Sequence, residues 1–139
     1  HPAELARLCA ASPVPVALDE ELVACRVVTS DVAARLLDDI HPHYIVLKPS
    51  LVGGFAGTSC WMHAAQERGI GWWITSALES NVGLAAIARY TASFHSEMPQ
   101  GLGTGALYTN NIPSPLRLIG EKLSYDTHGV WHYPELTWK

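Results

Sequence analysis

One short apolar stretch decides the fold of this chain, and it reads Tyr44-Ile45-Val46-Leu47-Lys48-Pro49. An apolar run that does not alternate with polar residues is typical of a strand inside a parallel sheet. A charged, unpaired lysine inside such a strand would be costly, whereas a lysine at the carboxyl end of the strand lies where α/β folds place their chemistry. We therefore predict that Lys48 follows the end of a buried strand and belongs to a functional site.

Similar junctions precede and follow this stretch. Residues 14–18 form a short apolar run that ends at Asp19 and Glu20, and residues 71–75 form another that ends at Thr75 and Ser76. The glycine-rich residues 101–105 mark a fourth strand or strand end. The spacing of roughly 27 to 30 residues between junctions is the length of one βα unit and predicts a parallel sheet with helices on its faces. Half of a (β/α)8 barrel and a small doubly wound sheet both satisfy this pattern.

The segments between the junctions carry helical patterns. We predict helices over residues 2–11, from a cap at Ser30 through Leu37, over 58–68 and over 80–95, and two short strands over 116–119 and 121–125. The apolar stripe of the longest helix is predicted to contain Val82, Ala86, Ile87, Tyr90 and Phe94. The aromatic tail, with Trp131, Tyr133, Pro134 and Trp138, is predicted to pack against other parts of the protein.

Composition excludes several classes of partner. The net charge of −4 and the lack of a basic stripe argue against nucleic acid, and the apolar runs are too short to span a bilayer. Cys9, Cys25 and Cys60 are odd in number and widely separated, which predicts inert thiols in a reducing, cytoplasmic compartment rather than a disulfide framework.

The residues at the junctions leave several chemical roles open. Asp19 has the chemistry of a Mg²⁺ ligand or of a helix cap. Lys48 suits a Schiff base, an electrostatic role beside an enolate, or a solvent-facing position. Thr75 and Ser76 precede the longest helix, where free backbone N–H groups favour an anion, and capping by Ser76 or Ser80 is the structural alternative.

Four motifs, taken in order, resemble the o-succinylbenzoate synthases of the enolase superfamily, in the form found in Bacteroidetes. They are Ala17–Leu22 (ALDEEL), Ile45–Gly54 (IVLKPSLVGG), Thr75–Leu84 (TSALESNVGL) and Gln100–Gly105 (QGLGTG). Each motif alone is weakly specific, but their order and spacing from about residue 3 to about residue 126 are specific.

The resemblance implies an architecture and a set of roles. Residues 1–107 would be the C-terminal half of a (β/α)8-type barrel, strands five to eight, and residues 108–139 would return to a capping domain. Asp19 falls on a Mg²⁺ ligand and Lys48 on the lysine that faces the intermediate. The positions that contact the succinyl side of the substrate fall on Thr75, Ser76 and Gly101.

The reaction implied is the dehydration of 2-succinyl-6-hydroxy-2,4-cyclohexadiene-1-carboxylate to o-succinylbenzoate in menaquinone biosynthesis, through a Mg²⁺-stabilised enolate. A strand-two lysine and two further metal carboxylates have no counterpart in the chain, so we expect them on an N-terminal half that precedes His1, and we expect residues 1–139 alone to be inactive. The alternatives are an N-acylamino acid racemase or dipeptide epimerase, a Schiff-base aldolase that uses Lys48, and a non-catalytic binding fragment.

Overall fold

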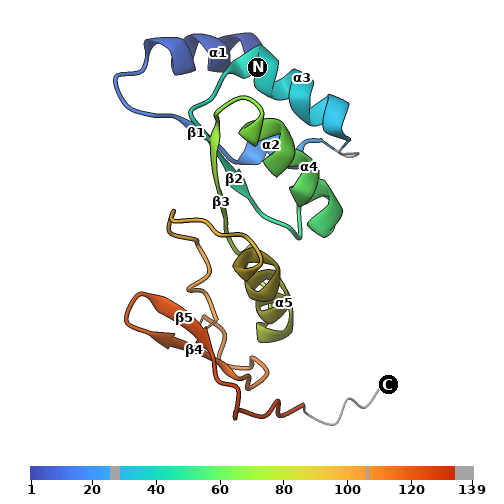
Figure 1. The fold of residues 1–139 in the computed structure, drawn as a ribbon, viewed down its shortest axis with the longest axis vertical. Helices are drawn as coiled ribbons and strands as arrows, with labels where there is room; N and C mark the ends of the chain where they lie inside the picture. Colours follow the sequence, from blue (N-terminus) through green and yellow to red (C-terminus); the bar gives the residue numbers. More distant parts are fainter. Residues whose placement is uncertain (26–28, 106, 134–139) are drawn as a thin grey trace. The chain divides into compact units, whose positions relative to one another are not determined.

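Three parallel strands, in the spatial order β1-β2-β3, form the sheet of the N-terminal part of the chain (Figure 1). The structure is a computed structural model that describes residues 1–25, 29–105 and 107–133. The strands are β1 (Ala17–Leu18), β2 (Tyr44–Leu47) and β3 (Gly71–Ile74). Tyr44 pairs with Ala17 on one side and with Gly71 on the other, so β2 is the central strand. The predicted parallel sheet is confirmed, with β1 shorter than the predicted residues 14–18.

Four helices accompany this sheet: α1 (Pro2–Ala11), α2 (Glu20–Val23), α3 (Ser30–Ile40) and α4 (Gly54–Gln66). Helix α3 packs against both α1 and α4, and α4 in turn contacts β2 and β3. Ile45, Leu47 and Ile74 of the strands and Trp61 of α4 are completely buried. The core of this part of the chain therefore contains the apolar strand residues that the sequence pattern predicts.

Two helix starts differ from the prediction. The cap of α3 is Thr29, whose hydroxyl accepts a hydrogen bond from the Val32 N–H at 3.3 Å, and Ser30 is the first helical residue. Helix α4 begins at Gly54, before the predicted Thr58, because Gly53 and Gly54 adopt positive φ angles of 92° and 69° and turn the chain directly into the helix. Gly69, also at positive φ, follows α4 as expected.

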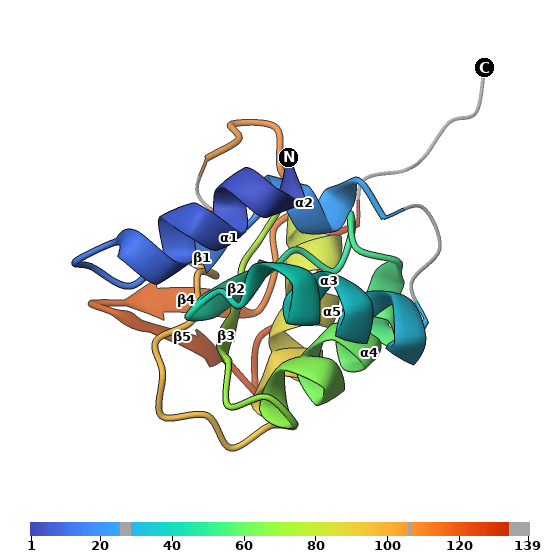
Figure 2. The same ribbon diagram turned by 90° about the horizontal axis from the view of Figure 1, so that it is seen from above.

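The chain divides into two compact units, His1–Thr75 and Ser76–Lys139. The second unit contains helix α5 (Asn81–Ala92) and the strands β4 (Leu116–Ile119) and β5 (Lys122–Tyr125), which pair as an antiparallel hairpin (Figure 2). Gly120 between them has a φ of 59°, which suits glycine in a tight turn. The predicted short strands are confirmed. The predicted boundary at residue 107 stays a prediction.

The predicted apolar stripe of α5 is wrong at Val82 and Ala86, which are exposed, whereas Ile87 is buried and the half-buried Tyr90 and Phe94 rings pack edge to face 4.9 Å apart. The buried residues of this helix are Leu84, Ala85, Ile87 and Thr91, whereas Val82 is 42% exposed. The helix is apolar on more than one side, with Arg89 as its one charged residue, so periodicity alone did not determine which side is buried.

The end of the described chain is aromatic. Trp131 and Tyr133 stack with ring centroids 5.6 Å apart, whereas the predicted packing of Pro134 and Trp138 lies outside the described residues. Within the described ranges, the helices are all too short or too polar to cross a bilayer.

Candidate functional site

Lys48 and Asp19 form an ion pair at the carboxyl ends of β2 and β1. The Lys48 Nζ lies 2.8 Å from Asp19 Oδ2, to which it donates a hydrogen bond, and 2.8 Å from Oδ1. It also donates to Glu20 Oε1 at 3.2 Å. The Lys48 side chain is 17% exposed, so these two carboxylates offset the cost of holding an ammonium group largely out of water.

The carboxylates also hold the lysine in its charged form. The hydrogen bond to Asp19 is the main reason that the pKa of Lys48 is raised, and the hydrogen bond and charge of Glu20 add to the effect, against the opposing effect of burial. A lysine whose pKa is raised stays protonated at neutral pH. This favours the electrostatic role of Lys48 over a Schiff base, which needs a neutral amine.

The two-residue period of the strands explains why these side chains meet. Tyr44 and Val46 project from the face of β2 opposite to Ile45 and Leu47, and Lys48 continues their alternation just beyond the strand. On β1, Ala17 pairs with Tyr44, and Asp19 follows two residues later, just beyond the carboxyl end of that strand. Two strand ends that are separated in the sequence thus share one edge of the sheet.

Asp19 is suited to hold a cation. It is the N-cap residue of α2, but its side chain makes no capping hydrogen bond. The alternative role of Asp19 as a helix cap is therefore not observed. The Oδ1 atom is buried and lies 2.8 Å from the Lys48 ammonium as an ion-pair contact. Carboxylate oxygens are the ligands that Mg²⁺ prefers, and this carboxylate is not used to cap α2. Among the described residues no three His, Cys, Asp or Glu side chains form a metal cluster, so further ligands would come from elsewhere.

The three predicted substrate-contact residues lie near the next strand end. The Thr75 N–H donates to the Leu47 carbonyl at 2.9 Å and so extends the pairing of β3 with β2. Ser76, the first residue of the second unit, donates its N–H to the Gly101 carbonyl at 3.0 Å. The structure thus brings together Asp19 with Lys48 in one unit and Ser76 with Gly101 in the other.

Three contacts of the candidate site were not predicted from the sequence. Glu20 is a second partner of Lys48. Thr104 donates its hydroxyl to Ser76 Oγ at 2.7 Å, and Tyr108 donates its hydroxyl to the Leu78 carbonyl at 3.0 Å. Glu20 could have been found from its position beside Asp19, but contacts made by Thr104 and Tyr108 over about thirty residues leave no local pattern.

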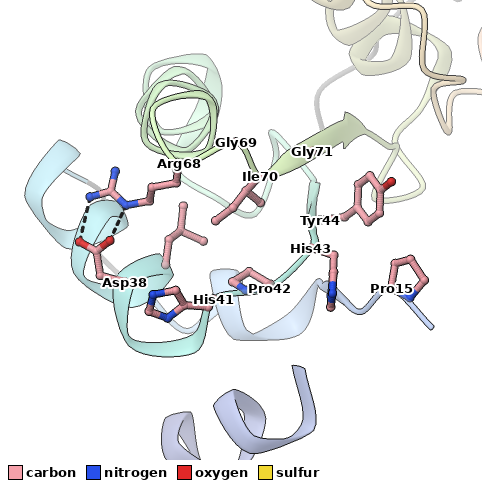
Figure 3. Close-up of a pocket in the computed structure, with 11 residues that line it drawn as sticks. Pro15, Asp38, His41, Pro42, His43, Tyr44, Arg68, Gly69, Ile70 and Gly71 are labelled. Carbon is pink, nitrogen blue, oxygen red and sulfur yellow. Dashed lines mark hydrogen bonds and ion pairs between the residues drawn. The ribbon is translucent and has the colours of Figure 1, made fainter. Parts of the chain in front are cut away.

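A pocket of about 660 Å³ lies at the opposite end of the strands, where β2 and β3 begin with Tyr44 and Gly71 (Figure 3). Arg68 at its wall donates to both oxygens of Asp38, at 2.7 Å and 2.9 Å, and to the Ala64 carbonyl. This guanidinium is therefore engaged by the protein itself. The pocket contains none of the predicted site residues.

The sequence is similar to that of a known protein. Over 117 residues, 84% of the chain, the sequence is 58% identical to o-succinylbenzoate synthase from Desulfotalea psychrophila, and the match covers 31% of that protein. The chain thus spans about a third of the length of the curated relative it matches. No family model matches the sequence.

The fold is similar to that of solved structures. The crystal structure of MenC from D. psychrophila matches 88% of this chain with a TM-score of 0.82 and 56% identity, over 34% of its own length. A muconate lactonizing enzyme from Klebsiella pneumoniae matches 88% of the chain with a TM-score of 0.75, over 34% of its own length, but at 21% identity, which shows the fold alone. The resemblance to o-succinylbenzoate synthase is confirmed over the matched part of the chain.

Proposed function

We propose that this chain is the C-terminal third of an o-succinylbenzoate synthase, a hydro-lyase of menaquinone biosynthesis. The observation that carries the proposal is the Lys48–Asp19 pair at adjacent strand ends within a sequence that is 58% identical to such an enzyme. The substrate is a small carboxylate, 2-succinyl-6-hydroxy-2,4-cyclohexadiene-1-carboxylate. All three cysteines are free, which suits the reducing cytoplasm.

In the complete protein, β1, β2 and β3 would be strands five, six and seven of a (β/α)8-type barrel, with Gly101 at strand eight. The last residues of the chain would return to the capping domain. The preceding two thirds of the protein would supply the first four strands, a strand-two lysine and two further metal carboxylates. The parallel order and the shared edge for Asp19 and Lys48 support this arrangement.

Asp19 would hold Mg²⁺ through its carboxylate, which lies at the end of β1 and makes no capping hydrogen bond to α2. When bound, Mg²⁺ supplies a positive charge that favours an anionic carboxylate and the negative charge that develops on it. Lys48, which donates a hydrogen bond to Oδ2, orients the Asp19 carboxylate.

Lys48 acts on the charge that develops during the reaction. The C1 proton of the substrate is removed by a base outside this chain, the C1–H electron pair forms the new ring double bond, and the C6 hydroxyl leaves with a proton as water, so that the ring becomes aromatic. Negative charge builds on the C1 carboxylate side as the proton leaves. An ammonium group that remains protonated stabilises this charge electrostatically.

The test is a chimera in which this chain replaces the matching third of the D. psychrophila enzyme. With Mg²⁺ and the cyclohexadiene substrate, we expect the ultraviolet spectrum of o-succinylbenzoate to appear. A second arm supplies an N-acylamino acid and follows its optical rotation, which detects the racemase alternative. A folded, Mg²⁺-binding chimera that turns over neither substrate, or that racemises the amino acid without dehydrating the diene, would contradict the proposal.

A further inference from the structure

The hydroxyl of Ser76 is fully engaged inside the second unit. Ser76 is 7% exposed, and its Oγ lies 2.7 Å from Glu79 Oε2. In this contact the Ser76 hydroxyl donates its one proton to the Glu79 carboxylate. The Leu78 N–H, at 2.9 Å, and the Thr104 hydroxyl, at 2.7 Å, donate to the two remaining acceptor positions of Oγ.

The backbone donors of the same loop are engaged as well. The Ser76 N–H is bonded to Gly101, and the Leu78 N–H is bonded to Ser76 Oγ. Between them, the Ala77 N–H lies 2.9 Å from Glu79 Oε2 and 3.1 Å from Oε1. The anion that the sequence led us to expect beside this loop is therefore the chain's own Glu79.

Other features of the loop depend on this arrangement. Leu78 has a φ of 67°, which is unfavourable for a leucine and persists only where surrounding contacts enforce it. Its carbonyl accepts the Tyr108 hydroxyl. Gly83 leaves space for the glutamate, since a Cβ at that position would lie 2.9 Å from the Glu79 Cβ. Ser76 and Leu78 thus connect the loop to Gly101, Thr104 and Tyr108, and Glu79 holds Ser76 and Ala77 within the loop.

We propose that Glu79 is a positioning residue of the active site that acts through Ser76, an inference that rests on the proposed function. Its carboxylate directs the Ser76 hydroxyl inward and fixes the Ala77 N–H, so that residues 76–78 keep one shape against the succinyl side of the substrate. Ser76 then contacts substrate with its main chain and Cβ rather than by donating its hydroxyl proton.

The experiment uses the complete enzyme, or the active chimera, with Glu79→Gln, Ser76→Ala and the double variant. The matched control is Glu97→Gln, an exposed glutamate of the same unit. We expect E79Q to lower kcat/KM by about tenfold, mainly through KM, the scale of one lost charge-assisted hydrogen bond. Mg²⁺ affinity, measured by calorimetry below the melting temperature of every variant, should not change.

The double variant separates positioning from a general loss of stability. If Glu79 acts through Ser76, the kinetic effects of E79Q and S76A are non-additive, and the double variant resembles E79Q. An E79Q enzyme that is folded and as active as E97Q, or kinetic effects that simply add, would overturn the inference. Loss of activity only at temperatures where E79Q unfolds would overturn it as well. If the unsubstituted protein has no dehydratase activity, the proposed function fails instead.

Discussion

Lys48 shows at the scale of one residue how burial and charge are balanced. Its ammonium group is held largely out of water, which is tolerable because two carboxylates lie within hydrogen-bonding distance. Both carboxylates follow β1, the strand next to the one that ends at Lys48. These contacts offset the cost of burying the Lys48 side chain, and they also hold its ammonium group at the carboxyl ends of the strands.

Replacing Lys48 with alanine in the complete enzyme should lower the rate of dehydration by about a hundredfold or more, the effect of removing one electrostatic group that faces developing charge. Mg²⁺ affinity should be retained, because Asp19 keeps its carboxylate. Turnover is followed by absorbance and Mg²⁺ binding by calorimetry, with Lys122→Ala on the exposed hairpin as the control. Retained turnover would remove Lys48 from the mechanism.

Gly71 leaves space in β3 for the side chain of Tyr44. A Cβ at Gly71 would overlap the ring of Tyr44, its partner in β2. Gly71→Ala should therefore destabilise the complete enzyme by about 1–3 kcal/mol, as overpacking typically does. Denaturant unfolding measures this change, and Gly103→Ala is the control, since a Cβ there meets nothing closer than 3.9 Å. Equal stability of the two variants would show that Tyr44 moves aside freely.

At the scale of elements, helix α3 is connected to the residues after α4 by charge as well as by packing. Arg68 makes a bidentate pair with Asp38, a geometry that is stronger than a single contact. The hydrogen bond from Arg68 is the main reason that the pKa of Asp38 is lowered. The pair joins elements whose apolar faces already contact each other.

The lowered pKa of Asp38 predicts a pH dependence. A carboxyl group whose pKa is lower in the folded than in the unfolded state contributes stability above its unfolded pKa, and this contribution is lost as the pH falls through the folded value. Below about pH 4, the melting temperature of the complete protein should therefore fall more steeply than that of an Asp38→Asn variant. Asp39→Asn, an exposed neighbour on α3, should behave as the parent protein does; identical acid profiles for all three proteins would contradict the prediction.

At the scale of the whole molecule, the two faces of the β1–β3 sheet differ in how completely their side chains are buried. Ile45, Leu47 and Ile74 are completely buried, but Tyr44 and Trp73 on the opposite face are only half-buried. In the proposed complete protein, further strands would extend this sheet into a barrel.

Residues 1–139 alone should therefore give no turnover with substrate and Mg²⁺, because the proposed base and two metal carboxylates lie outside them. Co-expression with the N-terminal two thirds of the D. psychrophila enzyme should restore activity if the two pieces assemble. Product formation is measured by absorbance for each piece and for the pair. Clear turnover by residues 1–139 without a partner would contradict both the proposed division of the site and the proposal that these residues form only part of a barrel.

The sequence by itself determined the parallel strands, most of the helices and the placement of Asp19 and Lys48 at strand ends, because these follow from apolar runs and from a regular spacing along the chain. It did not determine which side of α5 is buried, that Thr29 rather than Ser30 caps α3, or that Glu20 also holds Lys48. Only the tertiary structure decided that Glu79, Ser76 and Thr104 form one network. The physical reason is that hydrogen bonds between segments distant in the sequence depend on where folding brings those segments. The local pattern of residues does not specify how far apart they lie in the folded chain.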